Sequence, residues 1–198
     1  IGCQMNVYDS EQIAMRLAGL GYQQTPSLDK ADLVIVNTCT IRAKAEQKAF
    51  SFLGRLARLK KKKPGLITAI GGCVAQQEGE KIFKRIPYLD LVFGTQAIDR
   101  LPSLIQKIAQ KRCRIVDIEQ TDKPLFQETG DSIAPDSQVS RFVTIMRGCD
   151  NFCSYCVVPY VRGRETSRHP DAIINEIRQL AESGFKEVTL LGQNVNSY

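Results

Sequence analysis

The sequence lacks any apolar run that approaches the roughly 18 residues required by a membrane-spanning helix. It also shows no recognisable signal peptide, and it begins at Ile1 rather than at Met, which suggests a trimmed start. We therefore expect no membrane partner and a cytoplasmic location.

The cysteine pattern of a secreted disulfide scaffold is missing as well. Such scaffolds are short and loop-rich, whereas this chain of 198 residues predicts long periodic helices and apolar strands. Its seven cysteines are an odd number, so they cannot all pair with one another. We interpret the thiols as reduced and available to bind metal.

Acidic residues are outnumbered by basic ones, which gives a formal net charge of +6 and an isoelectric point near 9.0. This balance suits an anionic partner such as RNA, although many moderately basic proteins have no nucleic-acid role. Charge alone therefore leaves the partner open.

The first part of the chain alternates apolar strands with periodic helices. Strands are expected at 33–36, 66–70, 89–93 and 114–118, and helices at 7–20, 41–62, 76–85 and 98–111. Asn6 is the expected cap of the first helix. This βαβ rhythm predicts an α/β domain over residues 1–118, built as a doubly wound parallel sheet.

Residues 119–139 are polar and turn-rich, and we interpret them as a linker. A second unit, residues 140–198, then offers a strand at 142–146, a helix at 171–183 and a strand at 188–191. The expected buried stripe of its helix is Ile173, Ile174, Ile177, Leu180 and Ala181. Two parallel strands and one helix cannot close a core, so we expect this domain to be incomplete.

Three cysteines lie within eight residues, directly after the strand at 142–146. They are Cys149, Cys153 and Cys156, here called the loop trio. A structural zinc site prefers paired Cys-x2-Cys modules with four ligands, and both ferredoxin patterns also supply four thiolates. Three thiolates on a 4Fe–4S cube leave one iron open to another ligand. Three buried cysteines in a loop, or zinc completed by a distant residue, remain alternatives.

A second set, Cys3, Cys39 and Cys73, is spread along the chain at intervals of 36 and 34 residues. We call it the edge trio, because each member is expected at the carboxyl end of a strand and just before a helix, where parallel strands share one edge. Helix N-termini there favour thiolates, and Gly71-Gly72 would let the backbone approach a bulky cluster. Chance placement remains an alternative. Cys113 begins a strand and is expected to be an ordinary thiol.

The Cys-x3-Cys-x2-Cys spacing after the first strand of a βα unit resembles the radical S-adenosylmethionine superfamily, whose catalytic domain is a full or partial βα barrel of TIM type. The resemblance implies that the loop trio holds a 4Fe–4S cluster and that S-adenosylmethionine chelates its open iron. Electron transfer to the sulfonium would then break a C–S bond and give a 5′-deoxyadenosyl radical. The barrel would be truncated at the C-terminal end of this chain.

Two trios in one chain narrow the resemblance. The strings Gly2-Cys-Gln-Met-Asn-Val-Tyr-Asp-Ser-Glu11, Asn37-Thr-Cys-Thr-Ile-Arg42 and Gly71-Gly-Cys73 resemble the methylthiotransferases, which carry an auxiliary 4Fe–4S cluster ahead of the radical domain. Ile145-Met-Arg-Gly-Cys-Asp-Asn-Phe-Cys153 and Val157-Val-Pro-Tyr-Val-Arg-Gly-Arg-Glu165 are similar to the branch that modifies N6-isopentenyladenosine beside the tRNA anticodon. The resemblance implies two S-adenosylmethionine molecules, one methylating sulfur at the auxiliary cluster and one activating adenine C2.

Further site residues are expected around the loop trio. Tyr155 matches the family position that packs near the adenine, and a plain loop-packing aromatic is an equal alternative. Gln193 and Asn194 follow the second strand of the barrel, where the resemblance implies contact with the methionine moiety.

Basic residues follow the loop trio on the same rim. Arg162, Arg164 and Arg168 are candidates for RNA or cofactor contact, whereas His169, the only histidine, is expected to be a loop residue. The basic end of the helix at 41–62 is interpreted as a solvated face, with phosphate contact as the alternative.

The expected partners are tRNA carrying isopentenyladenosine, a flavodoxin- or ferredoxin-like electron donor, and a supplier of sulfur or clusters, with the protein itself a monomer. A sister methylthiotransferase that acts on threonylcarbamoyl-adenosine or on a ribosomal-protein aspartate remains an alternative. So do a non-catalytic iron–sulfur electron carrier and a zinc-stapled RNA-binding module.

Overall fold

The computed structural model describes residues 2–40, 43–121 and 139–198. The chain forms two compact units, residues 1–119 and residues 120–198, and each is described by itself. The predicted linker falls mostly outside the described residues. Within the described ranges, no helix combines the length and the apolar character needed to cross a membrane.

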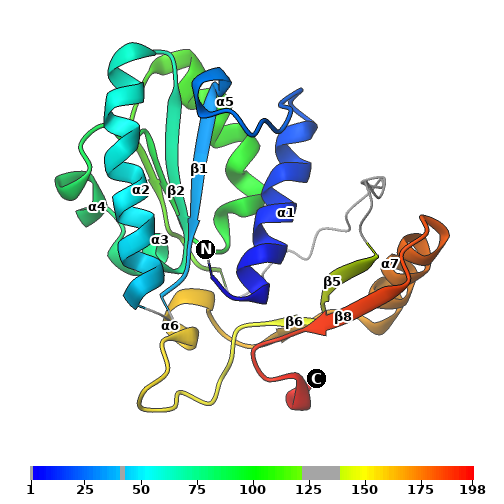
Figure 1. Cartoon of the computed structure of the whole chain (residues 1–198). Helices are drawn as coiled ribbons and strands as arrows, with labels where there is room; N and C mark the ends of the chain where they lie inside the picture. The colour runs from blue at the N-terminus through cyan, green and yellow to red at the C-terminus, as the bar shows by residue number, and fades with distance from the viewer. Residues whose placement is uncertain (1, 41–42, 122–138) are drawn as a thin grey trace. The chain divides into compact units, whose positions relative to one another are not determined.

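The first unit is built on a parallel sheet with the strand order β1-β2-β3-β4 (Figure 1). The strands are β1 (Leu33–Thr38), β2 (Ile67–Gly72), β3 (Leu91–Phe93) and β4 (Ile115–Asp117). Every residue of β2 and β3 is buried, which is the pattern of central strands covered on both faces.

Helices cover both faces of this sheet (Figure 1). One layer contains α1 (Gln4–Ala18), η2 (Ala97–Arg100) and α5 (Leu101–Lys111), and the other contains α2 (Ala43–Lys62), α3 (Cys73–Glu78) and α4 (Lys81–Arg85). A short turn, η1 (Leu28–Lys30), precedes β1. Alternate residues of β2 point to the two layers, with Ala69 packed toward α1 and α5 and Ile70 toward α2 and α3. The predicted α/β class with a parallel sheet is confirmed.

Several boundaries differ from the sequence-based expectation. Helix α1 begins three residues early, at Gln4, so Cys3 rather than Asn6 is its N-cap residue. The helix expected at 76–85 is two helices, because Gly79 adopts a positive φ of 52° between them. Strands β1 and β2 each extend two residues beyond the expected ends, to Thr38 and Gly72, and so run directly up to two cysteines of the edge trio.

The second unit contains one βαβ element. Strand β5 (Ser140–Thr144) pairs in parallel with β8 (Glu187–Leu191). Helix α7 (Pro170–Glu182) lies between them in sequence and packs its apolar side chains against these strands to form the core of the unit. The unit also contains a short two-stranded antiparallel ribbon, which the sequence pattern does not predict. In this ribbon, β6 (Met146–Arg147) pairs with β7 (Thr166–Ser167), and α6 (Val158–Arg162) lies between the two strands in sequence. A final turn, η3 (Val195–Ser197), follows β8.

The predicted stripe of α7 is only partly correct. Ile173 is buried, and Ile177 and Leu180 pack against the core. Ile174, however, is 45% exposed, and Ala181 is exposed as well. A two-stranded sheet covers only one side of a helix, so residues at the margin of the stripe remain in contact with solvent.

Candidate functional site

The carboxyl ends of β1 and β2 place two cysteines of the edge trio on neighbouring strands. Thr38 and Gly72 are Cα partners in the parallel register, and Cys39 and Cys73 are the next residues along the two strands. Both of these cysteines are buried. The two cysteine-bearing segments therefore leave the sheet side by side and at the same level.

The first turn of α1 brings the third cysteine to the same edge. The backbone carbonyl of Cys3 accepts hydrogen bonds from the amides of Asn6 (3.0 Å) and Val7 (3.1 Å). The side-chain Nδ2 of Asn6 donates to the carbonyl of Thr38 at 3.1 Å, which ties this turn to the last residue of β1. The strand expected before Cys3 has no support, since Gly2 is not in a strand and Ile1 lies outside the described residues.

The double glycine is explained by packing between strands. A Cβ atom at Gly72, whose φ is +90°, would lie 2.3 Å from the carbonyl oxygen of Thr38. A Cβ at Gly71 would lie 2.2 Å from the ring of Phe93. Neither glycine faces open space, so their role is to allow the close approach of β1, β2 and β3 rather than that of a cluster.

The donor set of the edge trio suits iron and sulfide, because thiolates are soft ligands. Among the described residues, no three His, Cys, Asp or Glu side chains are gathered as ligands of a single metal ion. A 4Fe–4S cube makes a different demand, since each thiolate binds a different iron. The assignment of a 4Fe–4S cube to the edge trio therefore rests on its thiolate chemistry and stays a prediction.

The loop trio lies between β6 and α6. Cys149 is buried, and its amide donates to the carbonyl of Gly163 at 3.3 Å. Cys153 is exposed and Cys156 is half-buried, with the amide of Cys156 donating to the carbonyl of Cys153 at 2.9 Å. The β6–β7 ribbon closes the base of the loop. The three cysteines therefore share one short segment whose two ends are joined by this ribbon.

Two unusual backbone conformations shape this loop. Gly148 has a φ of +76°, and a Cβ there would lie 2.0 Å from the carbonyl oxygen of Arg164. Phe152 also has a positive φ, 45°, which is uncommon for a residue with a side chain. Its ring meets that of Tyr160 edge-on at 5.9 Å and lies 5.4 Å from the guanidinium carbon of Arg164. The apolar and helical patterns do not single out Phe152, and its position between two cysteines is the signal that the sequence offers.

Tyr155 is 90% exposed, so it does not pack against the loop. Among the described residues, the Tyr155 ring therefore does not serve as an aromatic that packs the loop, and it is accessible to a ligand. Contact with an adenine stays a prediction.

The three arginines of the rim have different environments. Arg168 is buried, and its Nη1 donates to Glu176 Oε2 (2.6 Å) and to the carbonyl of Thr144 (2.9 Å), which ties α7 to the end of β5. Arg162 is also buried. Arg164 is mostly exposed, with a 3.6 Å approach to Asp150 and the ring of Phe152 beside its guanidinium. Of the three, Arg164 is the one whose charge is directly available to a phosphate.

The residues after β8 and before α7 have clear placements. Gln193 Oε1 is buried and has no hydrogen-bond partner among the described residues, so contact of Gln193 with the methionine moiety stays a prediction. Asn194 follows it and is half-buried. His169 is the N-cap residue of α7, where Nδ1 accepts from the amide of Asp171 at 3.4 Å, as expected of a loop residue.

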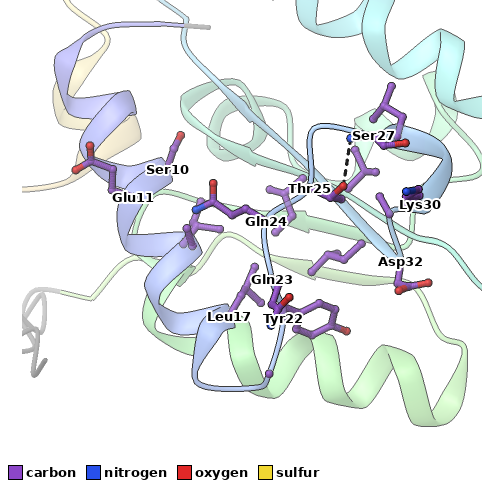
Figure 2. A pocket seen from close by; sticks show the side chains of 18 of the residues that line it. Ser10, Glu11, Leu17, Tyr22, Gln23, Gln24, Thr25, Ser27, Lys30 and Asp32 are labelled. Carbon is purple, nitrogen blue, oxygen red and sulfur yellow. Dashed lines mark hydrogen bonds between the residues drawn. The ribbon is translucent and has the colours of Figure 1, made fainter. Parts of the chain in front are cut away.

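An open groove lies elsewhere in the first unit. Figure 2 shows its wall, formed by Ser10, Glu11 and Leu17 of α1 and by the segment 21–32 that leads into β1. Phe52 of α2 also lines it. No cysteine is among the described residues that line this groove, so it is separate from the edge trio.

Two family models match the chain. Residues 1–94 match UPF0004, described as an uncharacterized protein family, and residues 143–198 match the radical SAM superfamily. Each match contains one cysteine trio.

Curated relatives match over the whole chain. Proteins named tRNA-2-methylthio-N(6)-dimethylallyladenosine synthase are 56% identical in Desulfosudis oleivorans, 54% in Geobacter metallireducens and 56% in Syntrophus aciditrophicus, over 100% of this chain. The chain covers 42%, 44% and 43% of those relatives, so it spans less than half of their length. The chain therefore combines a UPF0004 segment with a following radical SAM segment, and it is similar over its whole length to part of these synthases.

Proposed function

We propose that the protein containing this chain is a tRNA-modifying enzyme that methylthiolates C2 of N6-isopentenyladenosine next to the anticodon. The observation that carries this proposal is the presence of two cysteine trios, one in each unit, in a chain similar along its entire length to synthases named for this product. The expected cofactors are two 4Fe–4S clusters and S-adenosylmethionine.

The loop trio would hold the cluster that, with bound S-adenosylmethionine, supplies radical chemistry. Its thiols differ in burial, with Cys149 anchored and Cys153 exposed. Cluster binding would therefore order the exposed part of the loop around the anchored part. Tyr155 and the orphaned Oε1 of Gln193 are the groups we assign to S-adenosylmethionine, as an exposed aromatic face and a buried acceptor.

The edge trio would hold the auxiliary cluster, where sulfur is methylated before transfer. Cys39 and Cys73 are buried at adjacent strand ends, and Cys3 caps a helix that is hydrogen-bonded to one of those ends. Three thiolates leave one iron without a protein ligand, and an open position is what a sulfur-delivering site requires.

The RNA and protein partners follow from this chemistry. Arg164 is the described rim residue best placed to contact tRNA phosphate, since its side chain is exposed next to the loop trio. The cluster must be reduced, so we propose a flavodoxin- or ferredoxin-like donor. A supplier of sulfur or clusters must also act on the protein.

Anaerobic iron and sulfide quantification on the full-length protein tests the cofactor assignment. We expect about eight irons in the parent and about four when either trio is replaced by alanine. Zinc without labile sulfide would contradict the proposal, as would two trio variants that retain all the iron of the parent.

Two further measurements separate the alternatives. Adding S-adenosylmethionine should change the cluster spectrum of an enzyme with an open iron and leave that of an electron carrier unchanged. Activity should appear on isopentenylated anticodon-stem RNA and not on the unmodified RNA. Activity on threonylcarbamoylated RNA or on a ribosomal protein instead would identify a sister enzyme.

A further inference from the structure

A buried hydrogen-bond network connects α1 to the end of β1 beside the edge trio. Asn6 is only 2% exposed, and its Nδ2 donates to the carbonyl of Thr38 at 3.1 Å across 32 residues of sequence. Thr38 is the residue directly before Cys39, and the Asn6 amide is bonded to the carbonyl of Cys3. Asn6 is therefore hydrogen-bonded both to the segment that carries Cys3 and to the segment that carries Cys39.

A second asparagine closes the network from the strand side. Asn37 Nδ2 donates to the carbonyl of Asn6 at 3.0 Å and to Ser10 Oγ at 2.9 Å. Ser10 Oγ in turn donates to the same Asn6 carbonyl at 2.8 Å. The contact between helix and strand is thus made by reciprocal polar bonds, with each asparagine bonding to the backbone of the other element.

The third cysteine segment is joined to this network through β2. Thr38 Oγ1 donates to the carbonyl of Gly71 at 2.6 Å, two residues before Cys73. On the other side, a Cβ at Gly2 would lie 2.6 Å from Asn6 Oδ1, so the residue before Cys3 is packed directly against the asparagine side chain. All three cysteine-bearing segments are therefore held by Asn6, Asn37 and Thr38, which we call the clasp.

Stability alone is a poor explanation for this arrangement. A buried side-chain amide adds little net stability when it is hydrogen-bonded, and it is destabilising when it has no partner. An apolar side chain at position 6 could be buried without needing any hydrogen-bond partner of its own. Directional hydrogen bonds instead fix the distance and angle between the joined segments. The hydrogen bonds of the clasp therefore fix how the three cysteine-bearing segments lie relative to one another.

We propose that the clasp is a positioning device that presets the separation of the Cys3, Cys39 and Cys73 segments for cluster binding. The inference rests on the proposed auxiliary cluster, and it adds residues that do not ligate iron themselves. Outer-shell partners of metal ligands commonly change metal affinity by about 10-fold to 100-fold when they are removed. Loss of the clasp should have an effect of this size on the edge cluster.

The test uses the full-length protein with the loop trio replaced by alanine, so that the edge cluster is the only one present. Asn6→Leu removes the hydrogen bond to Thr38 and replaces the amide by an apolar side chain of similar size. We expect at least about tenfold faster loss of iron to a chelator and a shifted electron paramagnetic resonance spectrum of the reduced cluster. Asn37→Ala, at a half-buried position that is easier to substitute, should shift the same spectrum by a smaller amount.

Thr68→Val is the matched control. Thr68 is fully buried at the opposite end of β2, where its Oγ1 lies 3.1 Å from two acceptors, the carbonyl of Tyr88 and Asp90 Oδ2. This variant removes a buried polar bond from the same sheet, so it should lower thermal stability while leaving the spectrum and the iron retention unchanged. A purely structural role for the clasp predicts that Asn6→Leu behaves as Thr68→Val does.

The outcomes distinguish the two proposals. If the background protein binds iron, and both asparagine variants keep its spectrum and its retention, the clasp is refuted while the auxiliary cluster stands. If the background protein binds no iron, or if Cys3→Ala, Cys39→Ala and Cys73→Ala leave its iron unchanged, the auxiliary cluster is refuted and the clasp with it.

Discussion

The two cysteine trios are assembled in opposite ways. The edge trio draws its members from segments 36 and 34 residues apart, and strand register, glycine packing and a polar clasp bring them to one edge of a sheet. The loop trio draws its members from eight consecutive residues, and a two-residue ribbon closes the base of the loop. The first arrangement depends on the tertiary fold, and the second depends mainly on local sequence.

This difference has a consequence for how each site responds to damage. Two of the edge cysteines are buried directly after strands, so a substitution that shifts those strands also displaces the cysteines. In the loop, one cysteine is anchored and another is exposed, so part of the site can rearrange without unfolding the unit. We therefore expect substitutions at the edge to affect stability and iron together, and substitutions at the loop to affect iron first.

The largest effect is expected for Gly72→Ala. The new Cβ would lie 2.3 Å from a backbone oxygen at a φ of +90°, so β1 and β2 must separate. We expect more than about 3 kcal/mol lost from the free energy of unfolding, together with the iron of the edge trio. Chemical denaturation and iron analysis of the full-length protein would measure both.

Gly21→Ala is the control for Gly72→Ala. Its φ is +83°, and a Cβ there meets nothing within 4 Å. It should cost only about 1 kcal/mol, from the backbone conformation alone, and should keep all the iron. Equal losses in the two variants would mean that strand spacing does not control the edge site.

Arg168→Gln is expected to have the next largest effect, this time in the second unit. It would leave Glu176 and the carbonyl of Thr144 without their buried cationic partner. Removing one member of a buried ion pair commonly costs about 3 kcal/mol, and a small unit with few buried residues has little reserve. Hydrogen exchange of α7 and β5 would detect the loss. Arg178→Gln, the same change at an exposed position of α7, should leave exchange unaltered.

The sequence predicted the parts of this architecture that depend on local pattern. Apolar runs located all four strands of the sheet, and the two cysteines that follow β1 and β2 were correctly placed at strand ends. The clasp was not predictable in this way, because Asn6 looks like a helix cap until the strand 32 residues away is in place. Arg168 resembled an RNA-binding residue of the rim for the same reason, since its burial depends on α7.

The short ribbon escaped prediction for a different reason. Strands β6 and β7 contain two residues each, which is too short for any periodic pattern to be recognised. The pairing is set by Gly148, whose φ of +76° turns the chain toward Arg164. A glycine next to a cysteine motif was the visible signal, and its positive φ became clear only from the fold.

Gly148→Ala tests the local character of the loop trio. Its Cβ would lie 2.0 Å from the carbonyl oxygen of Arg164, so the ribbon and the loop must shift apart. Because that shift is confined to the short ribbon and the loop that it closes, we expect only about 1–2 kcal/mol in stability and a loss of iron limited to this trio. Gly184→Ala, with a φ of +95° and open space around it, is the control and should keep the iron. Simultaneous loss of the edge iron would contradict the proposed independence of the sites.

Arg164→Gln is expected to have the smallest effect, and it tests which of the two units contacts the proposed tRNA substrate. If the proposed tRNA contact holds, the exposed Arg164 beside the loop trio meets mainly one phosphate, so its removal should weaken binding modestly and lower the slope of log affinity against log salt by about one. Arg58→Gln removes the same charge from an exposed position of α2 in the first unit. Lys60, near Arg58 at the same helix end, is mostly buried and bonded to Asp90 and to the carbonyl of Leu66, so it is not part of a solvated face. If the rim of the loop trio faces the tRNA and the exposed Arg58 does not, a salt titration of binding should change slope in the first variant and stay unchanged in the second. The reverse result would move the RNA contact to the unit that carries the edge trio.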